Sequence, residues 1–100
     1  MKRLIPILSV FLALAAGCRP EPFANAVIAP NPAYVGEDIE FRSASTNADY
    51  VEWEMGDGFL YSDPVVTHYY VDPGTYDVKL KAFGEKGGVD VKYFPVDVIG

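Results

Sequence analysis

Few residues of this chain offer chemistry, and the clearest of them is Asp57. It stands between two glycines in the stretch WEMGDG, residues 53–58. A carboxylate acts as a general acid or base when a partner group lies within hydrogen-bond reach. The chain has one histidine, His68, and no motif in which a nucleophile accompanies a base. We therefore interpret Asp57 as a turn residue that accepts hydrogen bonds from backbone amides two residues further on.

Metal ligands are also scarce in the sequence. His68 is the only imidazole and Cys18 the only thiol, so the usual ligands of a zinc site are not available. Asp57, Asp63 and Asp72 in predicted loops leave a calcium site as an alternative, but calcium takes six to eight clustered oxygens and no D-x-D-x-D-G run is present. We expect a packed, hydrogen-bonded His68 and a domain without metal or cofactor.

The residues best suited to binding follow the turn. Phe59, Leu60 and Tyr61 form an apolar tripeptide, and Tyr69 lies on the next predicted strand. An apolar loop tip lowers solubility unless it is covered. The tripeptide is therefore expected either to fold back as a lid on one end of the domain or to form a contact patch. In such a patch, Tyr61 and Tyr69 would offer flat faces to a sugar ring or a peptide.

The first 17 residues have the layout of a secretory signal peptide. Two basic residues precede an apolar run of 13 residues, 4–16, which is shorter than the roughly 18–20 residues that cross a bilayer. The run ends in LAAGC, which resembles the lipobox of bacterial lipoproteins. This resemblance implies cleavage before Cys18, attachment of diacylglycerol to its thiol and acylation of the new amino terminus. The alternative is cleavage by an ordinary signal peptidase, which leaves a free thiol.

The chain that remains after such cleavage is acidic. Removal of Lys2 and Arg3 leaves 6 basic residues (8 − 2) against 14 acidic residues, a net charge of −8 over residues 18–100. This charge argues against nucleic acids and anionic lipid surfaces as partners. Residues 18–24 are predicted to be a short tether, with a reach of about 20 Å. Residues 25–100 are predicted to be one domain. A disulfide bond within the chain is not possible, because the sequence has only one cysteine.

The domain has the sequence pattern of a β protein. Short runs with period-2 alternation are separated by Gly and Pro, and no stretch keeps a 3.6-residue period. Residues 49–55 are typical, with Val51, Trp53 and Met55 facing inward and the glutamates between them facing outward. Residues 25–29, 36–45, 64–70, 74–83 and 89–100 are the other predicted strands. This number of short strands predicts a two-sheet sandwich.

The last predicted strand changes its facing part-way. Its apolar residues have one parity up to Tyr93 and the opposite parity from Val96. One extra residue near Phe94 would restore the facing, so we predict a β-bulge there. Pro95 has no amide hydrogen and is therefore expected at a sheet edge or beyond the paired part of the strand.

Three motifs together resemble the PKD domain, an immunoglobulin-like module. Its pattern is roughly W-x-F-G-D-G, then T-H-x-Y, then P-G-x-Y-x-V-x-L, and Met55 replaces the Phe of the first motif. The resemblance spans residues 25–99 and implies an all-β immunoglobulin-like sandwich with a buried Trp53 and a tyrosine corner at Tyr76. The matching residues are Trp53, Gly56, Asp57, Gly58, Thr67, His68, Tyr70, Pro73, Gly74, Tyr76, Val78 and Leu80.

The resemblance and the N-terminal pattern together imply a function outside catalysis. We expect an exported, lipid-anchored module of a bacterial envelope, on the outer membrane or the outer leaflet of the plasma membrane, that contacts an extracellular protein or carbohydrate. The alternative is a structural spacer or small subunit of a larger envelope complex with no ligand of its own. An enzyme is not expected, because the sequence has no nucleophile motif, metal cluster or phosphate-binding loop.

Overall fold

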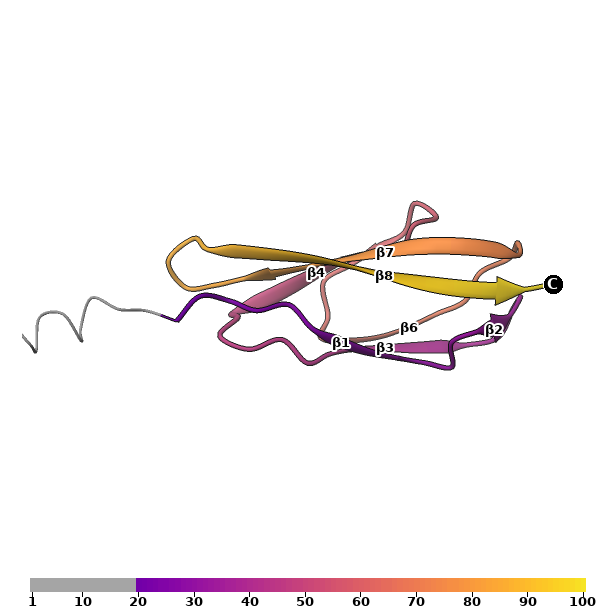
Figure 1. The fold of residues 1–100 in the computed structure, drawn as a ribbon, viewed down its shortest axis with the longest axis horizontal. Helices are drawn as coiled ribbons and strands as arrows, with labels where there is room; N and C mark the ends of the chain where they lie inside the picture. The colour runs from indigo at the N-terminus through magenta and orange to yellow at the C-terminus, as the bar shows by residue number, and fades with distance from the viewer. Residues whose placement is uncertain (1–19) are drawn as a thin grey trace, which may run out of the picture.

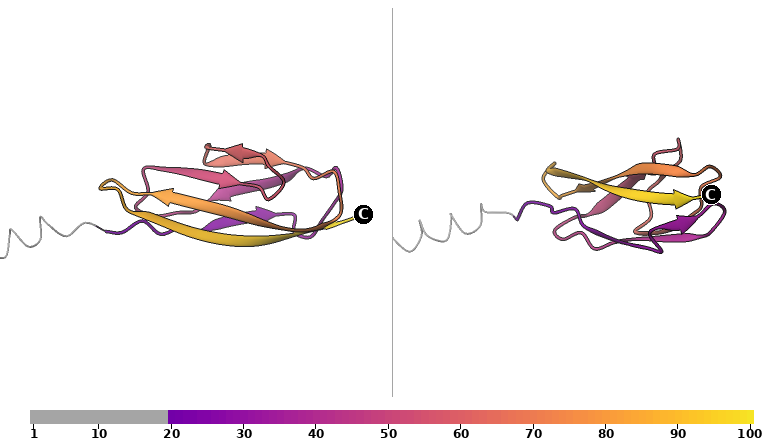
Figure 2. Two further views of the ribbon diagram at one scale, coloured as in Figure 1. Left: turned by 90° about the horizontal axis from the view of Figure 1, so that it is seen from above. Right: turned by 45° about the vertical axis from the view of Figure 1, so that its right-hand side comes forward.

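The structure, a computed structural model, describes residues 20–100, which form two β-sheets packed face to face (Figures 1 and 2). One sheet has the strand order β1-β3-β6 and the other β2-β8-β7-β4-β5. The strands are β1 (Ala26–Ala29), β2 (Ala33–Tyr34), β3 (Ile39–Ser43), β4 (Tyr50–Glu54), β5 (Leu60–Tyr61), β6 (Val65–His68), β7 (Gly74–Phe83) and β8 (Val89–Ile99). The predicted signal peptide and the predicted lipid site Cys18 lie outside the described residues.

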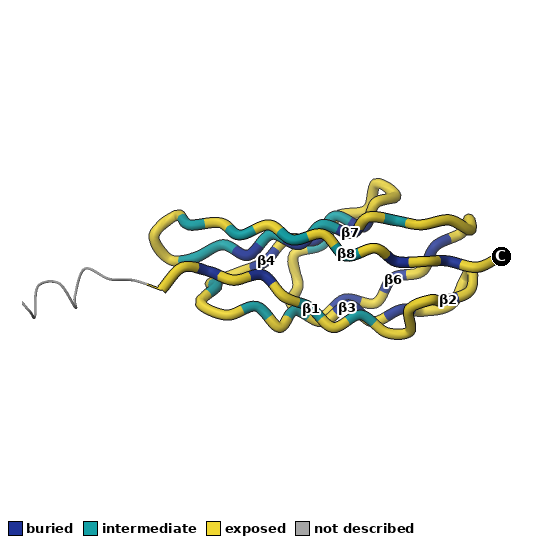
Figure 3. Tube along the Cα trace, in the orientation of Figure 1, coloured by how far each residue is buried: buried dark blue, intermediate teal, exposed yellow. Residues whose placement is uncertain are grey.

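The all-β sandwich predicted from the sequence is confirmed. The period-2 alternation of β3, β4 and β7 places one set of side chains between the sheets, where the buried positions cluster (Figure 3). In β6, Val66 and His68 point inward. Among the described residues, no helix has the length and apolar character to cross a membrane.

The centre of the core is a contact between aromatic rings of the two sheets. Trp53 of β4 and Phe41 of β3 are both fully buried, and their rings meet edge to face with centroids 5.8 Å apart. The indole Nε1 donates a hydrogen bond of 2.9 Å to the carbonyl oxygen of Asp63. The buried indole thus has apolar contacts around its ring and a partner for its one polar group.

The bulge predicted near Phe94 is wrong. β7 and β8 pair in a single antiparallel register from one end to the other. The inward residues in the first half of β8 are therefore Asp90 and Lys92, while the valines of that half face solvent.

The N-terminal segment explains this polar inner face. The amide of Ala24 donates a 2.7 Å hydrogen bond to Asp90 Oδ2, and the ammonium of Lys92 lies 3.9 Å from the centre of the Phe23 ring. Covered in this way, the two polar side chains do not need apolar neighbours.

The same segment corrects the expected end of the tether. Phe23 forms a two-way backbone bridge with Thr46, and Ala24 is fully buried in the core. Pro22 packs against Gly84 and Gly88, where an added Cβ would stand 3.0 and 3.1 Å from its ring. Residues 22–24 thus belong to the folded domain, which the sequence pattern predicted to begin at residue 25.

Pro95 lies at a sheet edge, as predicted. β8 pairs with β2 only at Val98 and Ile99, so the preceding part of β8 has no second neighbouring strand. There the Asn31 side chain takes the place of a strand: its Nδ2 donates to the carbonyl of Pro95, and its Oδ1 accepts from the amide of Asp97, both at 3.0 Å. Because backbone amides two residues apart point to the same side, the missing donor of Pro95 faces this edge.

Tyr70 gives the first testable prediction. Its buried hydroxyl donates a 2.8 Å hydrogen bond to the carbonyl of Met55, and burial, followed by the charge of Asp57, raises the pKa of Tyr70. The folded state therefore holds this proton above pH 10, where tyrosine in the unfolded chain loses it. The contribution of the protonated Tyr70 to the stability of the folded state is therefore fully present below about pH 10 and is lost as the pH rises above that value.

We expect the urea midpoint to fall more steeply between about pH 9 and about pH 11 in the wild type than in Tyr70→Phe. The exposed Tyr34 supplies the control, because Tyr34→Phe should keep the wild-type fall. An equal fall in Tyr70→Phe and the wild type would contradict the assignment.

Candidate functional site

The loop after β4 is a tight turn held by Asp57. Gly56 and Gly58 have φ angles of +86° and +100°, a region that side chains other than glycine rarely adopt. Between them, Asp57 Oδ1 accepts a 3.2 Å hydrogen bond from the amide of Phe59, which is the geometry expected of a turn residue. The amide of Met55 closes the turn by donating to the carbonyl of Phe59 at 3.0 Å.

Gly56 also allows the turn to lie directly on the start of β7. A Cβ at this position would stand 3.1 Å from the carbonyl oxygen of Asp77 and 3.3 Å from the Cβ of Tyr76. Glycine is therefore required here for its backbone angle and for its lack of a side chain. This close approach places Asp57 at the end of the sandwich, beside the inward-facing His68.

His68 links this turn to β5. Its ring is 5% exposed, with Nε2 2.8 Å from Asp57 Oδ2 and Nδ1 3.0 Å from the Tyr61 hydroxyl. An ionised carboxylate only accepts hydrogen bonds, so a neutral His68 must carry its proton on Nε2. The Tyr61 hydroxyl then donates to Nδ1, which completes a chain from Asp57 through His68 to Tyr61.

This series of hydrogen bonds has the residue types of a proton relay, and no pattern in the sequence placed Asp57 and His68 together. A general base needs a nitrogen that can reach the proton of a ligand. Here both ring nitrogens are already hydrogen-bonded within the protein, and the ring is buried. The geometry is that of a polar cross-link between the turn, β5 and β6, and it does not present a free base.

A hollow of ≈ 420 Å³ lies beside this cross-link. The turn, β5, β6 and the beginning of β7 all contribute to its wall, and the loop after β4 stands out beside β7 in the half of the domain nearer the C-terminus (Figure 1). Its lining is mainly aromatic and acidic: Asp57, Phe59, Tyr61, Thr67, His68, Tyr69, Val71, Asp72 and Tyr76.

The candidate binding residues of the sequence analysis separate into two groups. Phe59, Tyr61 and Tyr69 line the hollow, whereas Leu60 lines a different depression together with Glu54. Leu60 and Tyr61 form a short strand rather than a loop. Tyr61 is half-buried against the core, but Phe59 and Leu60 remain 56% and 71% exposed, so the tripeptide is not a lid.

Three further lining residues, Thr67, Val71 and Asp72, were not among the predicted binding residues. Thr67 was noted only as part of the T-H-x-Y motif and Asp72 only as a possible calcium ligand, because the sequence does not show that the segment after β6 lies beside the turn. Tyr76 was expected as a tyrosine corner, and its hydroxyl does donate a 2.7 Å hydrogen bond to the carbonyl of Asp72. Its ring also stacks on Tyr70, with centroids 4.1 Å apart.

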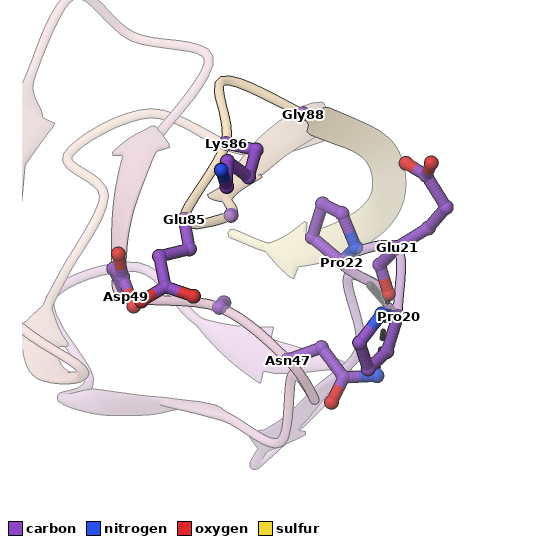
Figure 4. Close-up of a pocket in the computed structure, with 10 residues that line it drawn as sticks. Pro20, Glu21, Pro22, Asn47, Asp49, Glu85, Lys86 and Gly88 are labelled. Carbon is purple, nitrogen blue, oxygen red and sulfur yellow. Dashed lines mark hydrogen bonds between the residues drawn. The ribbon is translucent and has the colours of Figure 1, made fainter. Parts of the chain in front are cut away.

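A second hollow, of ≈ 350 Å³, lies at the opposite end of the sandwich. Figure 4 shows the residues that line it. The N-terminal segment and the β7–β8 hairpin surround it, and Asn47 Nδ2 donates a 3.3 Å hydrogen bond to the carbonyl of Glu21. It has no aromatic ring among its lining residues. Within residues 20–100, no three His, Cys, Asp or Glu side chains converge as metal ligands would, here or at the aromatic hollow.

The comparisons with known proteins decide the family. Residues 24–95 match the PKD domain. The chain belongs to the PKD domain family. The resemblance to this family that the three sequence motifs indicate is therefore confirmed. A search of curated protein sequences gives no significant match.

Solved structures of PKD domains share the fold. The PKD1 domain of Vibrio anguillarum Epp is 20% identical with a TM-score of 0.70, over 82% of this chain and 98% of that one. The PKD1 domain of the Vibrio cholerae metalloprotease PrtV is also 20% identical, with a TM-score of 0.69, over 81% of this chain and 100% of that one.

A structure of carbohydrate-binding modules from the β-sandwich superfamily, described as promiscuous in specificity, is 27% identical with a TM-score of 0.76. The match covers 83% of this PKD domain chain and 36% of that chain, so this chain spans little more than a third of its length.

The turn glycines give the second prediction. Gly56→Ala should lower the free energy of unfolding by about 2–4 kcal/mol, because it adds backbone strain to a close approach against the β7 backbone. Gly58→Ala is the matched control: it has a positive φ but open space around its Cα, so its cost should be about 1–2 kcal/mol. Urea denaturation followed by Trp53 fluorescence measures both values, and equal losses would contradict the packing argument.

Proposed function

We propose that this PKD domain is a non-catalytic binding module that presents the aromatic hollow to a carbohydrate. The observation that carries the proposal is that Phe59, Tyr61 and Tyr69 line one hollow together with the acidic residues Asp57 and Asp72. Sugar rings stack on flat aromatic faces, and a few polar groups at such a site orient their hydroxyls. The likeness to carbohydrate-binding modules at 27% identity supports the same ligand class.

The proposed location is the surface of a bacterial envelope membrane, with a lipid on Cys18 as the anchor. The sequence LAAGC supports it. From Cys18 to Pro22, where the folded domain begins, the chain reaches at most about 14 Å. The end of the sandwich around Gly84 would therefore lie next to the membrane. The hollow, at the other end of β7 and about 26 Å further along the strand, would face away from it.

A second candidate is a small subunit of a larger envelope complex. It is favoured by an apolar strip on the outer face of the five-stranded sheet, where Tyr50 stacks on Phe83 with centroids 4.5 Å apart. In the pairing register, Val89, Val91 and Tyr93 continue this strip along β8, and all three are exposed. Such a strip would pack against a large partner.

Binding through the hollow gives the third prediction. Phe59→Ala and Tyr69→Ala should each weaken binding to a glycan that scores on an array by about tenfold or more, because each removes an exposed ring from the wall. Leu60→Ala is the matched control: Leu60 is adjacent and more exposed, but lies outside the hollow. Isothermal titration calorimetry on the array hits measures the affinities.

Equal losses in the Leu60 variant and the two ring variants would contradict the site. An array without any hit, together with co-purification of a large partner whose binding is lost in Val91→Glu, would favour the subunit instead.

Lipidation gives the fourth prediction. Cells fed a clickable fatty acid should label the wild-type protein, and the label should disappear in Cys18→Ser, because the only thiol of the chain is removed. The same variant should move from the membrane fraction to the soluble fraction. A variant that keeps the label would disprove Cys18 as the anchor.

A further inference from the structure

The charge of the aromatic hollow restricts its ligand. Two acidic residues, Asp57 and Asp72, line it, and none of the described lining residues is Lys or Arg. His68 is buried with both nitrogens hydrogen-bonded, so it does not supply an accessible cation. An acidic ligand would be repelled by this wall, and a cationic one would be attracted.

The negative charge of Asp72 is not compensated by a neighbour. Within residues 20–100 its carboxylate has no hydrogen bond or ion pair, and its contact with Tyr76 uses the backbone carbonyl. The nearest lysines of β7, Lys79 and Lys81, have the strand parity that faces outward, and both lie within 4 Å of Glu54. They are therefore engaged on the far side of the sheet from the hollow.

Asp57 can also accept a further hydrogen bond. Each of its oxygens accepts one bond, from the Phe59 amide and from His68, whereas a carboxylate has about four lone-pair sites. These two bonds also fix the direction of its carboxylate, so a ligand would not have to order it. A donor group entering the hollow would meet a preorganised acceptor.

The aromatic rings add a second attraction for a cation. Phe59 and Tyr61 lie nearly parallel, with an interplanar angle of 16° and centroids 6.5 Å apart, and the Tyr69 ring stacks on that of His68 with centroids 6.4 Å apart. The face of an aromatic ring attracts an ammonium group, and several rings around one hollow are the usual way to hold such a group. Flat faces and carboxylates together suit a sugar that carries a positive charge.

We propose that the hollow binds a glycan through a protonated amine, that is, an amino sugar without its acetyl group. This inference rests on the proposed carbohydrate-binding function and names the ligand chemistry. An N-acetylated sugar of the same ring shape has no charge for Asp72 and Asp57 to attract. The hollow therefore discriminates by charge between two forms of one sugar.

The test compares two oligosaccharides of equal length, a β-1,4-linked glucosamine oligomer and its fully N-acetylated form. Calorimetry at a pH where the amine is protonated should show the amine form bound at least about tenfold more tightly. Its affinity should fall as salt is added, while that of the acetylated form should not.

Two variants locate the effect. Asp72→Asn should weaken glucosamine binding about fivefold or more and leave the acetylated oligomer unaffected, because it removes charge and little volume. Asp63→Asn is the control: it removes a carboxylate from the loop after β5, outside the lining, and should change neither affinity.

Equal affinity for both oligomers would overturn the charge selectivity and leave glycan binding standing. Tighter binding of an oligolysine peptide than of the glucosamine oligomer would overturn the sugar as the source of the amine. If neither oligomer binds, the inference of an amino-sugar ligand is wrong. The proposed carbohydrate-binding function is contradicted as well only if no glycan on the array binds.

Discussion

The edge-to-face contact between Trp53 and Phe41 is the interaction on which the rest of the structure depends. It joins the two sheets at the centre of the core, in a chain whose only cysteine rules out an internal disulfide. The hydrogen bond from the indole to Asp63 reaches beyond the core and fixes the loop between β5 and β6. The same side chain therefore sets the distance between the sheets and the position of the two strands that build the hollow.

The polar chain from Asp57 through His68 to Tyr61 is a second connection between the sheets. Tyr61 belongs to the five-stranded sheet and His68 to the three-stranded sheet, so their hydrogen bond crosses the sandwich. All its polar atoms have partners, which is the condition under which buried polar groups rigidify a fold. The rings that face the hollow are thus held by the same bonds that close the end of the domain, and a ligand would meet them already ordered.

Alternation predicted the inward faces of β3, β4 and β7 correctly, because each of these strands has one face on the apolar core. It failed for β8, where the N-terminal residues Phe23 and Ala24 cover Lys92 and Asp90. A periodic pattern shows which way a side chain faces, but not which distant segment lies opposite. The tyrosine corner at Tyr76 could be predicted because it is a local motif, in which the hydroxyl bonds a carbonyl four residues earlier. The hydrogen bond between Asp57 and His68 could not, because it depends on how two separate segments pack.

Asn31 has a consequence for how copies of the domain behave when they are crowded. Its carboxamide occupies the donor and acceptor that β8 would otherwise offer beside Pro95, and Pro95 itself brings no donor. A neighbouring chain that approaches this stretch finds nothing to which a new strand could be added. One short side chain thereby hinders the sheets of adjacent molecules from joining into a continuous ribbon at this stretch.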